Sequence, residues 1–428
     1  MNVLRTAHAE AEALPVAAKP EREAKVHNGV WGTAPSRRYD DLAAPFRPIF
    51  RRIQEGAIQR ECDRILPFEE IQWLKDAGFG AVRAPKEHGG RGATLPELFA
   101  LLAELAEADS NLTQALRVHF AYAEDVLNSQ DQARRERWFK RIAHGDIVGG
   151  AWTEIGEAKM ASFSTRVSAK NGRLTLTGAK YYTTGSLFAD WIDVGAVNDA
   201  DETVSAVVAA KAPGVAIVDD WDGFGQKLTA SGAATFTDVP VEPEHVASGE
   251  DRFGYSAAFV QQVHHATLVG IARAASGDAA RAVAERRRNY SHAAAARSSA
   301  DPQVLQVVGR IHSLTYAASA VMLKAAEALE RSFEHRDHAD LKEAANIAAE
   351  IEIAQAQTTI SALVLEATSS LFDALGASAT SVSKSLDRYW RNARTITSHN
   401  PRIYKDRIVG DFVVNGTPPP FQWRIGRS

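Results

Sequence analysis

The sequence contains a single cysteine, Cys62, among its 428 residues. One thiol excludes an intramolecular disulfide and any cysteine-rich metal site, and it is typical of a reducing compartment. No apolar run approaches the roughly 18 residues that a membrane-spanning helix needs. The first 25 residues, rich in Ala and Glu, lack the apolar segment of a signal peptide. We therefore expect a cytoplasmic protein without a membrane partner.

Other partner classes are disfavoured for the same kind of reason. The net charge is −4, so no basic field favours binding to nucleic acid. No Gly-x-Gly-x-x-Gly follows a predicted strand, which argues against a Rossmann nicotinamide site. The pairs His264–His265 and His335/His338 lack the Cys or carboxylate companions of a metal site, so we expect no metal. The remaining composition, 45% apolar and 24% charged, is that of an ordinary globular protein.

Helix and strand patterns divide the chain into three parts, which predicts an α+β fold. Apolar residues recur at helix spacing over residues 39–147. Residues 148–248 hold short runs rich in β-branched residues, separated by turn residues, which is typical of a β-sandwich or β-barrel. Residues 249–428 return to long Ala-rich helices and end in a loop. Residues 1–38 show no sustained period and are expected to form a flexible tail.

The last part is expected to contain four helices. They should lie near residues 257–290, 302–335, 339–376 and 383–393. The low polarity along one stripe of each helix favours a four-helix bundle. Helices of this length usually bury a second face against another subunit, so we expect an oligomer.

Several short motifs follow one another along this pattern. The first reads Gly-Ala-Lys-Tyr-Tyr-Thr-Thr-Gly, the second begins Asp-Asp-Trp and ends Ala-Ser-Gly, and a later one contains an aromatic-Arg-Asn-Ala-Arg run. In chain order the motifs are Gly178–Gly185, Asp219–Gly232, Val239–Glu244, Arg388–Pro401 and Asn415-Gly416 followed by Pro420.

These motifs and the α-β-α order resemble the acyl-CoA dehydrogenase fold over nearly the whole chain from about residue 40. The resemblance is greatest to its flavin-dependent monooxygenases, the branch of dibenzothiophene monooxygenase and related sulfur-acquisition enzymes. It implies an N-terminal helical domain, a central β domain and a C-terminal four-helix bundle. The same resemblance implies a homotetramer built as a dimer of dimers.

One departure from the dehydrogenases points to oxygen chemistry. In many of them the segment after the aromatic-Arg-Asx-Ala-Arg run supplies a catalytic glutamate. Here no carboxylate follows until Asp406, and His399 stands in the loop. A carboxylate suits the removal of a carbon-bound proton, whereas a histidine suits the handling of a proton at a peroxide.

The resemblance implies three catalytic candidates: His399, His119 and Thr184. His399 could instead be an ordinary loop residue, and a lone helical histidine such as His119 is more often structural. Threonine is also common in strands for reasons of propensity alone. A hydroxyl at Thr184 matches a position at which the monooxygenases hold a serine near the reactive edge of the flavin.

The resemblance also implies a set of cofactor contacts. Backbone and hydroxyl groups near the start of the β domain should meet the flavin, an arginine fork suits its phosphate, and a Gly-rich turn of a neighbouring subunit should complete the site. An Asn replaces Gln, and no Gly follows, in the run Arg286–Tyr290, which favours FMN over FAD. The predicted cofactor contacts are Trp152, Thr153, Thr184, Arg287, Gly376, Ala377, Ser378 and Arg394.

Four residues are expected to line the substrate pocket: Tyr122, Gly150, Trp221 and Ile396. Tyr122 lies one helical turn after His119. Gly150 takes the place of an Asn in the related enzymes, and Ile396 replaces a second His upstream of His399. Trp221 could equally be a core residue. The two replacements predict a substrate other than dibenzothiophene.

The sequence thus predicts a two-component monooxygenase that uses reduced FMN and dioxygen, through a C4a-(hydro)peroxyflavin, on a small organosulfur compound. Because no nicotinamide site is visible, a separate NAD(P)H:flavin reductase should supply the reduced flavin. An amine N-hydroxylase or an aromatic hydroxylase of the same fold is an alternative. Another is an FAD-dependent acyl-CoA dehydrogenase with a base such as Glu285, and a third is a catalytically silent binding protein.

Overall fold

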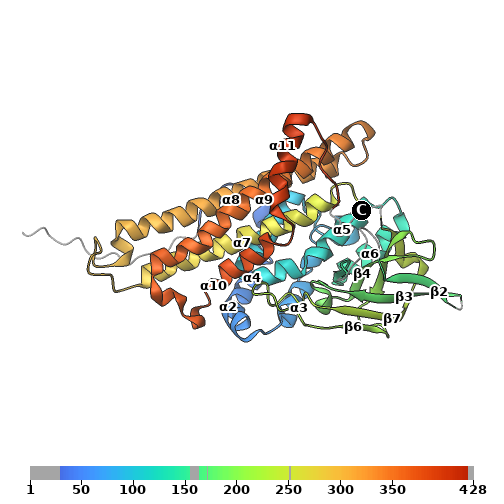
Figure 1. Cartoon of the computed structure of the whole chain (residues 1–428), viewed down its shortest axis with the longest axis horizontal. Coiled ribbons are helices and arrows are strands. Elements are labelled where there is room, and N and C mark those ends of the chain that lie inside the picture. The colour runs from blue at the N-terminus through green and yellow to red at the C-terminus, as the bar shows by residue number, and fades with distance from the viewer. Residues whose placement is uncertain (1–28, 155–162, 171, 250–251, 423–428) are drawn as a thin grey trace, which may run out of the picture.

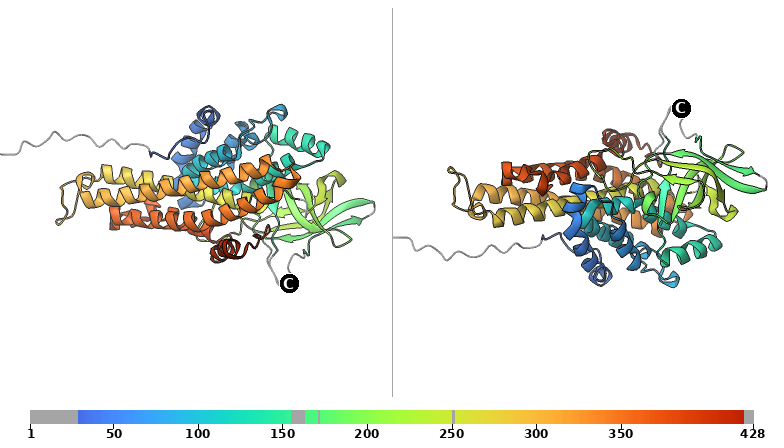
Figure 2. Two further views of the ribbon diagram at one scale, coloured as in Figure 1. Left: turned by 90° about the horizontal axis from the view of Figure 1, so that it is seen from above. Right: turned by 90° about the horizontal axis from the view of Figure 1, so that it is seen from below.

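The computed structural model describes residues 29–154, 163–170, 172–249 and 252–422. Long helices run along the longest axis of the molecule, and a β-sheet lies at one end beside shorter helices (Figure 1). Two perpendicular views show the same division between a helical body and a sheet (Figure 2). The predicted α+β fold, with helices before and after a central sheet, is confirmed.

The N-terminal part is helical, as expected. A capping box begins one of these helices: the Thr94 side chain accepts from the backbone N–H of Glu97, and the Glu97 side chain accepts from that of Thr94. The helix that follows is kinked at Asp109, whose backbone is not helical. The helices are α1 (Tyr39–Ala43), α2 (Arg47–Asp63), α3 (Phe68–Asp76), α4 (Leu95–Ala115), α5 (Arg117–Asn128) and α6 (Gln132–Ala143).

The central part forms one eight-stranded sheet. The strand order is β6-β7-β3-β2-β4-β5-β8, with β1 paired in parallel to β4. The order ends at β6 and β8, so within the described residues the sheet is open, where a β-barrel or a sandwich was expected. The strands are β1 (Val148–Ala151), β2 (Arg166–Lys170), β3 (Arg173–Lys180), β4 (Trp191–Val197), β5 (Thr203–Ala209), β6 (Val215–Ile217), β7 (Ala234–Val241) and β8 (Val246–Ser248).

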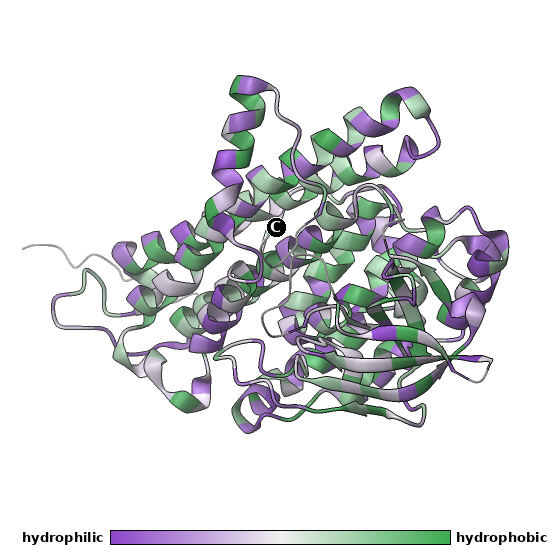
Figure 3. Ribbon diagram, turned by 45° about the vertical axis from the view of Figure 1, so that its right-hand side comes forward, coloured by the Kyte–Doolittle hydropathy of each residue, from purple (hydrophilic) through white to green (hydrophobic). Residues whose placement is uncertain are grey.

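The C-terminal part is again helical. Helix α7 packs against α4, α8, α9 and α10, so it lies at the centre of the helical body. The helices are α7 (Ser256–Glu285), α8 (Pro302–Glu334), α9 (Ala339–Leu375), α10 (Asp387–Thr397) and α11 (Lys405–Asn415). Apolar and polar residues alternate along these helices (Figure 3), and the buried apolar residues form a core shared with α2 and α4. The first four match the four predicted helices to within a few residues.

The predicted domain boundaries at residues 38, 147 and 248 stay predictions, although each falls between two elements of the structure. Most of the expected tail, residues 1–28, lies outside the described residues. The described part is held in place: the Trp31 ring stacks on that of His312 with centroids 4.6 Å apart, and Arg38 pairs with Glu97 at 2.6 Å. Within the described chain, no helix is long and apolar enough to cross a membrane.

Candidate functional site

Thr153 lies two residues after β1 and forms an isolated antiparallel bridge with Tyr181, just after β3. Its carbonyl accepts from the backbone N–H of Tyr181 at 2.9 Å. The next residue, Glu154, accepts from Lys180 Nζ at 2.6 Å and from residues 164–165. These donors hold the pKa of the Glu154 carboxyl at about 2 against the opposing effect of burial. The ion pair between Glu154 and Lys180 therefore fixes the backbone directly beside Thr153.

A chain of hydroxyl groups orients Thr184. Thr229 Oγ1 donates to the carbonyl of Gln226 at 2.9 Å, so it accepts from Ser231 Oγ at 2.7 Å. Ser231 must then accept from Thr184 Oγ1, also at 2.7 Å, because each hydroxyl has one proton. The Thr184 oxygen is thus left with its lone pairs free to accept a hydrogen bond. Thr184 was predicted from the sequence as a site residue, whereas Gln226, Thr229 and Ser231, which orient it, were not.

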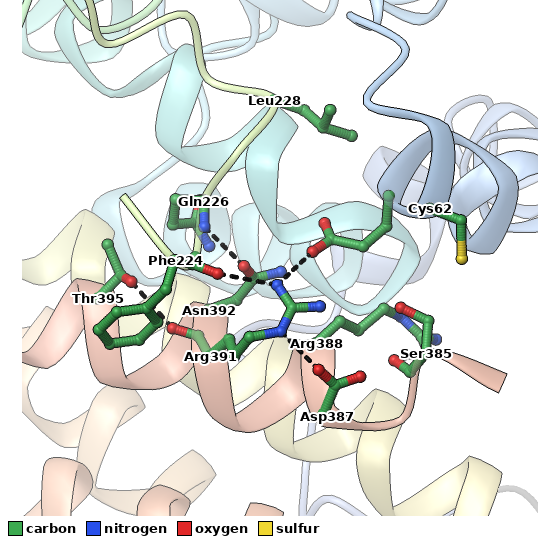
Figure 4. A network of polar contacts seen from close by, with 12 residues as sticks. Cys62, Phe224, Gln226, Leu228, Ser385, Asp387, Arg388, Arg391, Asn392 and Thr395 are labelled. Atoms are coloured by element: carbon green, nitrogen blue, oxygen red, sulfur yellow. Dashed lines mark hydrogen bonds and ion pairs between the residues drawn. The ribbon is translucent and has the colours of Figure 1, made fainter. Parts of the chain in front are cut away.

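The same Gln226 joins the β domain to α10 (Figure 4). Its backbone N–H donates to Asn392 Oδ1 at 2.6 Å, and the carbonyl of Phe224 accepts from Arg391 Nη1 at 2.9 Å. Arg391 also pairs with Glu61 of α2 at 2.7 Å. This network fixes the middle of α10 against the loop that carries the hydroxyl chain.

At the end of α10, the ring of His399 lies over the ring of His264 from α7. The ring centroids are 4.4 Å apart at an interplanar angle of 53°. Burial first, and then the positive charge of Arg117, lower the pKa of His399 to about 3. His399 is nevertheless exposed to solvent, so protein surrounds it without sealing it. A neutral imidazole therefore faces the accessible space at neutral pH.

A second directional network starts inside α7 and is anchored at a carbonyl. Gln262 Nε2 donates to the carbonyl of Met322 at 2.6 Å, which leaves Gln262 Oε1 as an acceptor for His265 Nδ1 at 2.8 Å. Burial lowers the pKa of His265 to about 3, so this ring is neutral and its Nε2 is an acceptor. Gln261 Nε2 donates to that Nε2 at 3.2 Å. The amide of Gln261 is thereby oriented.

The network continues to His399. Gln261 Oε1 accepts from Asn400 Nδ2 at 2.7 Å, so Asn400 presents Oδ1 to His399 Nδ1 at 3.3 Å. The proton of the neutral His399 ring then resides on Nδ1, and Nε2 carries a free lone pair. The tautomer of the exposed histidine is thus set by a chain of buried amides. This chain was not predicted from the sequence, because Met322 and Asn400 lie on other elements than its three members on α7.

Arg117, the first residue of α5, lies close enough to both histidines to lower their pKa. It has no hydrogen-bond or ion-pair partner among the described residues, and its buried Nε is unsatisfied. Burial lowers the pKa of its guanidinium to about 10. Both ring nitrogens of the fully buried His264 are also without partners. Sequence analysis singled out neither residue for this role.

His119 has a different environment from His399. Its Nε2 contacts the carbonyl of Gly80 at 2.9 Å, and its Nδ1 accepts from the backbone N–H of Val148 at 3.2 Å. The side chain is fully buried, and burial lowers its pKa to about 4. Both ring nitrogens are used by the backbone, so the geometry favours a structural role. The predicted catalytic role has no free ring nitrogen to support it.

The predicted pocket residues do not gather in one place. Tyr122 is buried against Trp138 with ring centroids 4.9 Å apart, and it lines a cavity of about 550 Å³ beside α6. Ile396 is buried in the main hydrophobic core. A Cβ at Gly150 would lie 2.7 Å from Val118 Cγ1. The valine therefore fills the space that a side chain at position 150 would need.

The two predicted tryptophans also lie apart. Trp152 Nε1 donates to Asp193 at 3.0 Å, and the guanidinium of Arg252 lies 4.4 Å from its ring centroid, so Trp152 packs against the sheet. Trp221 belongs to the loop before Phe224, where its ring is 6.1 Å from that of the exposed Tyr182. Trp221 is therefore nearer to the α10 side than Trp152.

The predicted phosphate and turn residues lie at the opposite end of the bundle. Arg287 is exposed just after α7, and Gly376 begins the turn with Ala377 and Ser378 after α9. The 21 residues of α7 between His264 and Glu285 span roughly 30 Å at the usual helical rise. Within one chain these residues cannot share a site with His399. Arg394 is exposed on α10, and its guanidinium has no partner among the described residues.

Comparison with known proteins places the chain in a family. The N-terminal domain model of acyl-CoA dehydrogenases matches residues 47–146, and the C-terminal domain model matches residues 262–401. A dibenzothiophene monooxygenase of Mycolicibacterium goodii is 28% identical, over 90% of this chain and 97% of that protein. The Pseudomonas putida protein named probable FMNH2-dependent monooxygenase SfnC is 26% identical, over 87% and 94%.

Similarity to a solved structure covers the same length. The crystal structure of FMN-bound TdsC from Paenibacillus sp. A11-2 superposes with a TM-score of 0.82 at 27% identity. The match covers 90% of this chain and 99% of TdsC. The motifs that carried the resemblance in the sequence therefore reflect similarity over the whole fold.

Proposed function

Because this chain belongs to the flavin-dependent monooxygenases of the acyl-CoA dehydrogenase fold, we propose that it uses reduced FMN to transfer one oxygen atom from dioxygen to a small organosulfur compound. The observation that carries the proposal is the neutral, exposed His399 at the end of α10. No carboxylate contributes to its pKa, nor to that of His264 beneath it. The carboxylate base of the dehydrogenases therefore has no counterpart among the charged groups that act on these two rings.

The residues present fit a flavin. Thr153 and Thr184 lie on the β-domain side, and Arg394 is exposed on α10 with a guanidinium free for an anionic group. When bound, reduced FMN supplies the two electrons that activate dioxygen. The Thr184 oxygen keeps its lone pairs free and would accept a hydrogen bond from an N–H of a bound flavin ring. His399 Nε2 is oriented to accept from a hydroxyl group in the site.

Dehydrogenation by an alternative base receives no support from the geometry. Glu285, the base considered for an acyl-CoA dehydrogenase, is exposed at the end of α7, about 30 Å from His264 along the helix. The further alternatives, N-hydroxylation of an amine and hydroxylation of an aromatic ring, need the same oxygen chemistry. They differ only in the substrate.

A separate NAD(P)H:flavin reductase completes the proposed system, since SfnC is named for its dependence on FMNH2. We also propose a homotetramer. The phosphate-side residues Arg287 and Gly376–Ser378 lie far from His399 in one chain, so a neighbouring subunit would have to supply them. The exposed apolar residues Val413 and Val414 on α11 offer a surface for such a contact.

The direct test is product formation with reduced FMN and dioxygen over a panel of small sulfides, sulfones and sulfinates, with amines and phenols as comparison. The proposal expects an oxygenated sulfur compound and no product without reduced flavin. Reduction of bound flavin by an acyl-CoA thioester, with no oxygenated product, would replace the proposal by the dehydrogenase alternative.

A further inference from the structure

Arg117 carries a charge for which the described protein provides no counterpart. Burial is the only cause that shifts its pKa, and no carboxylate acts on it. Its Nε is buried without a hydrogen bond. Arg117 is half-buried, and a guanidinium drawn partly out of water without an anion is costly. Two other buried arginines have such a partner: Arg60 pairs with Glu70 and Asp109, and Arg83 pairs with Glu124. Arg117 therefore lacks the anionic partner that Arg60 and Arg83 have, and an anionic ligand would supply it.

A second, independent observation points to the same place. His264 is fully buried, yet neither ring nitrogen has a partner. One of these nitrogens carries a proton in the neutral ring, so a hydrogen-bond donor is available. Gln114, just before Arg117, adds a buried Oε1 without a partner. Unsatisfied buried groups are few in folded proteins, and two of them, Arg117 Nε and the His264 ring, belong to residues close enough for the charge of Arg117 to lower the pKa of His264.

We propose that Arg117 and His264 form an anion-binding subsite beside His399, and that the substrate is a small organic acid such as a sulfinate. This inference rests on the proposed function, because it names the substrate class of the same site. A guanidinium suits the paired oxygens of a sulfinate or carboxylate, and the N–H of His264 adds a third contact. The anion would hold the oxidisable atom next to His399.

The chemistry of the subsite could serve another anion, the phosphate of FMN. The two sources are distinguished by binding measurements that need neither reduced flavin nor oxygen. The probes are methanesulfonate and dimethyl sulfone, which have similar size and differ by one negative charge. FMN and riboflavin, with and without the phosphate, form the second pair. Titration calorimetry is carried out with the full chain, followed by the variants Arg117→Met and Arg117→Lys.

We expect methanesulfonate to bind the wild-type protein at least roughly tenfold more tightly than dimethyl sulfone. Arg117→Met should abolish this preference, Arg117→Lys should keep part of it, and FMN affinity should change little in either. Arg51→Met, which removes an exposed arginine of α2, serves as the control and should leave the preference intact.

Two outcomes would overturn the inference. Equal binding of the charged and neutral probes to the wild type would remove the anion subsite. Loss of FMN binding in Arg117→Met, with riboflavin binding unchanged, would assign Arg117 to the cofactor phosphate. Neither result depends on whether the protein oxygenates sulfur, so failure of the subsite and failure of the proposed function are separable. If Arg117→Met binds none of the probes, its melting curve shows whether the variant is folded. For an unfolded variant, the preference of Arg117→Lys for methanesulfonate over dimethyl sulfone decides the question.

Discussion

His399 at the end of α10 lies over His264 of α7, with ring centroids 4.4 Å apart. The two rings differ in their hydrogen bonding: His399 has a partner and His264 has none. His399 is exposed and is joined through Asn400 to a chain of oriented amides, whereas His264 is fully buried with both ring nitrogens free. One histidine is prepared to act as an acceptor at the accessible face. The other is left available for a ligand.

Mutation of the two predicted catalytic histidines should affect different properties: stability for His119 and turnover for His399. His119→Ala leaves the carbonyl of Gly80 and the N–H of Val148 unpaired, so we expect a loss of about 3 kcal/mol in the free energy of unfolding. His399→Ala should cost less than about 1 kcal/mol, because the side chain is exposed, but should abolish product formation. Urea unfolding and turnover measured on both variants check this. Normal turnover in folded His399→Ala would remove His399 from the mechanism.

The tautomer of His399 should depend on a residue that does not touch it. Gln261→Leu removes the acceptor that orients Asn400, so we expect kcat/KM to fall by roughly tenfold or more while FMN affinity is unchanged. Gln261→Glu, when protonated, can still accept from Asn400 and donate to His265, and should recover most activity. Similar kinetic constants for the leucine and glutamate variants would show that the chain does not position His399.

The hydroxyl chain makes a prediction about Thr184. Thr184→Val removes the oriented oxygen, whereas Thr184→Ser keeps it. We expect the valine variant to release hydrogen peroxide roughly tenfold faster per flavin oxidised, because one hydrogen bond to the reduced flavin is lost. The serine variant should resemble the wild type. Peroxide yields that are equal in all three proteins would contradict a role for Thr184.

Gly150 tests the packing around the site. Gly150→Ala places a Cβ 2.7 Å from Val118 Cγ1 and should cost about 1–3 kcal/mol in stability through overpacking. The double variant Gly150→Ala, Val118→Ala should recover most of that loss, since the two side chains compete for one space. Thermal unfolding of Gly150→Ala, Val118→Ala and the double variant gives a double-mutant cycle for this contact. An additive result would mean that the contact does not limit position 150.

Binding of a small anion should be insensitive to pH over a wide window. The pKa of Arg117 is lowered only to about 10, so the guanidinium stays charged below that value. The pKa of His399 is lowered to about 3, so its ring is neutral from about pH 5 upward. Burial lowers the pKa of His264 well below its usual value, so that ring is neutral at neutral pH. Methanesulfonate affinity should be constant between about pH 5.5 and 8.5. A loss of affinity near pH 6.5 would instead identify a histidine as the cation.

The fold was predictable because its signals are local and repeated. The capping box at Thr94 and the four long helices of the C-terminal part follow from residue types at fixed spacing, and the structure contains them. The end of α10 was found from a motif within one segment. His399 and Thr184 were therefore predicted from the sequence and are also part of the site described from the structure.

The partners of these residues were not predictable from the sequence. Gln261, Asn400 and Ser231 come from separate elements, and only the fold brings them to His399 and Thr184. Tyr122 and His119 share a helix, yet their side chains meet different neighbours, because each contact is decided by tertiary packing. The missing partner of Arg117 is visible only in three dimensions.

The most direct test of the central claim follows reduced FMN after anaerobic mixing with the protein and then with oxygenated buffer, by flavin absorbance. The account predicts that oxidised flavin appears in a phase clearly slower than for free reduced FMN, and that Thr184→Val loses this delay. Reoxidation at the rate of free flavin, in wild type and variant alike, would contradict the claim that this site holds reduced FMN for oxygen transfer.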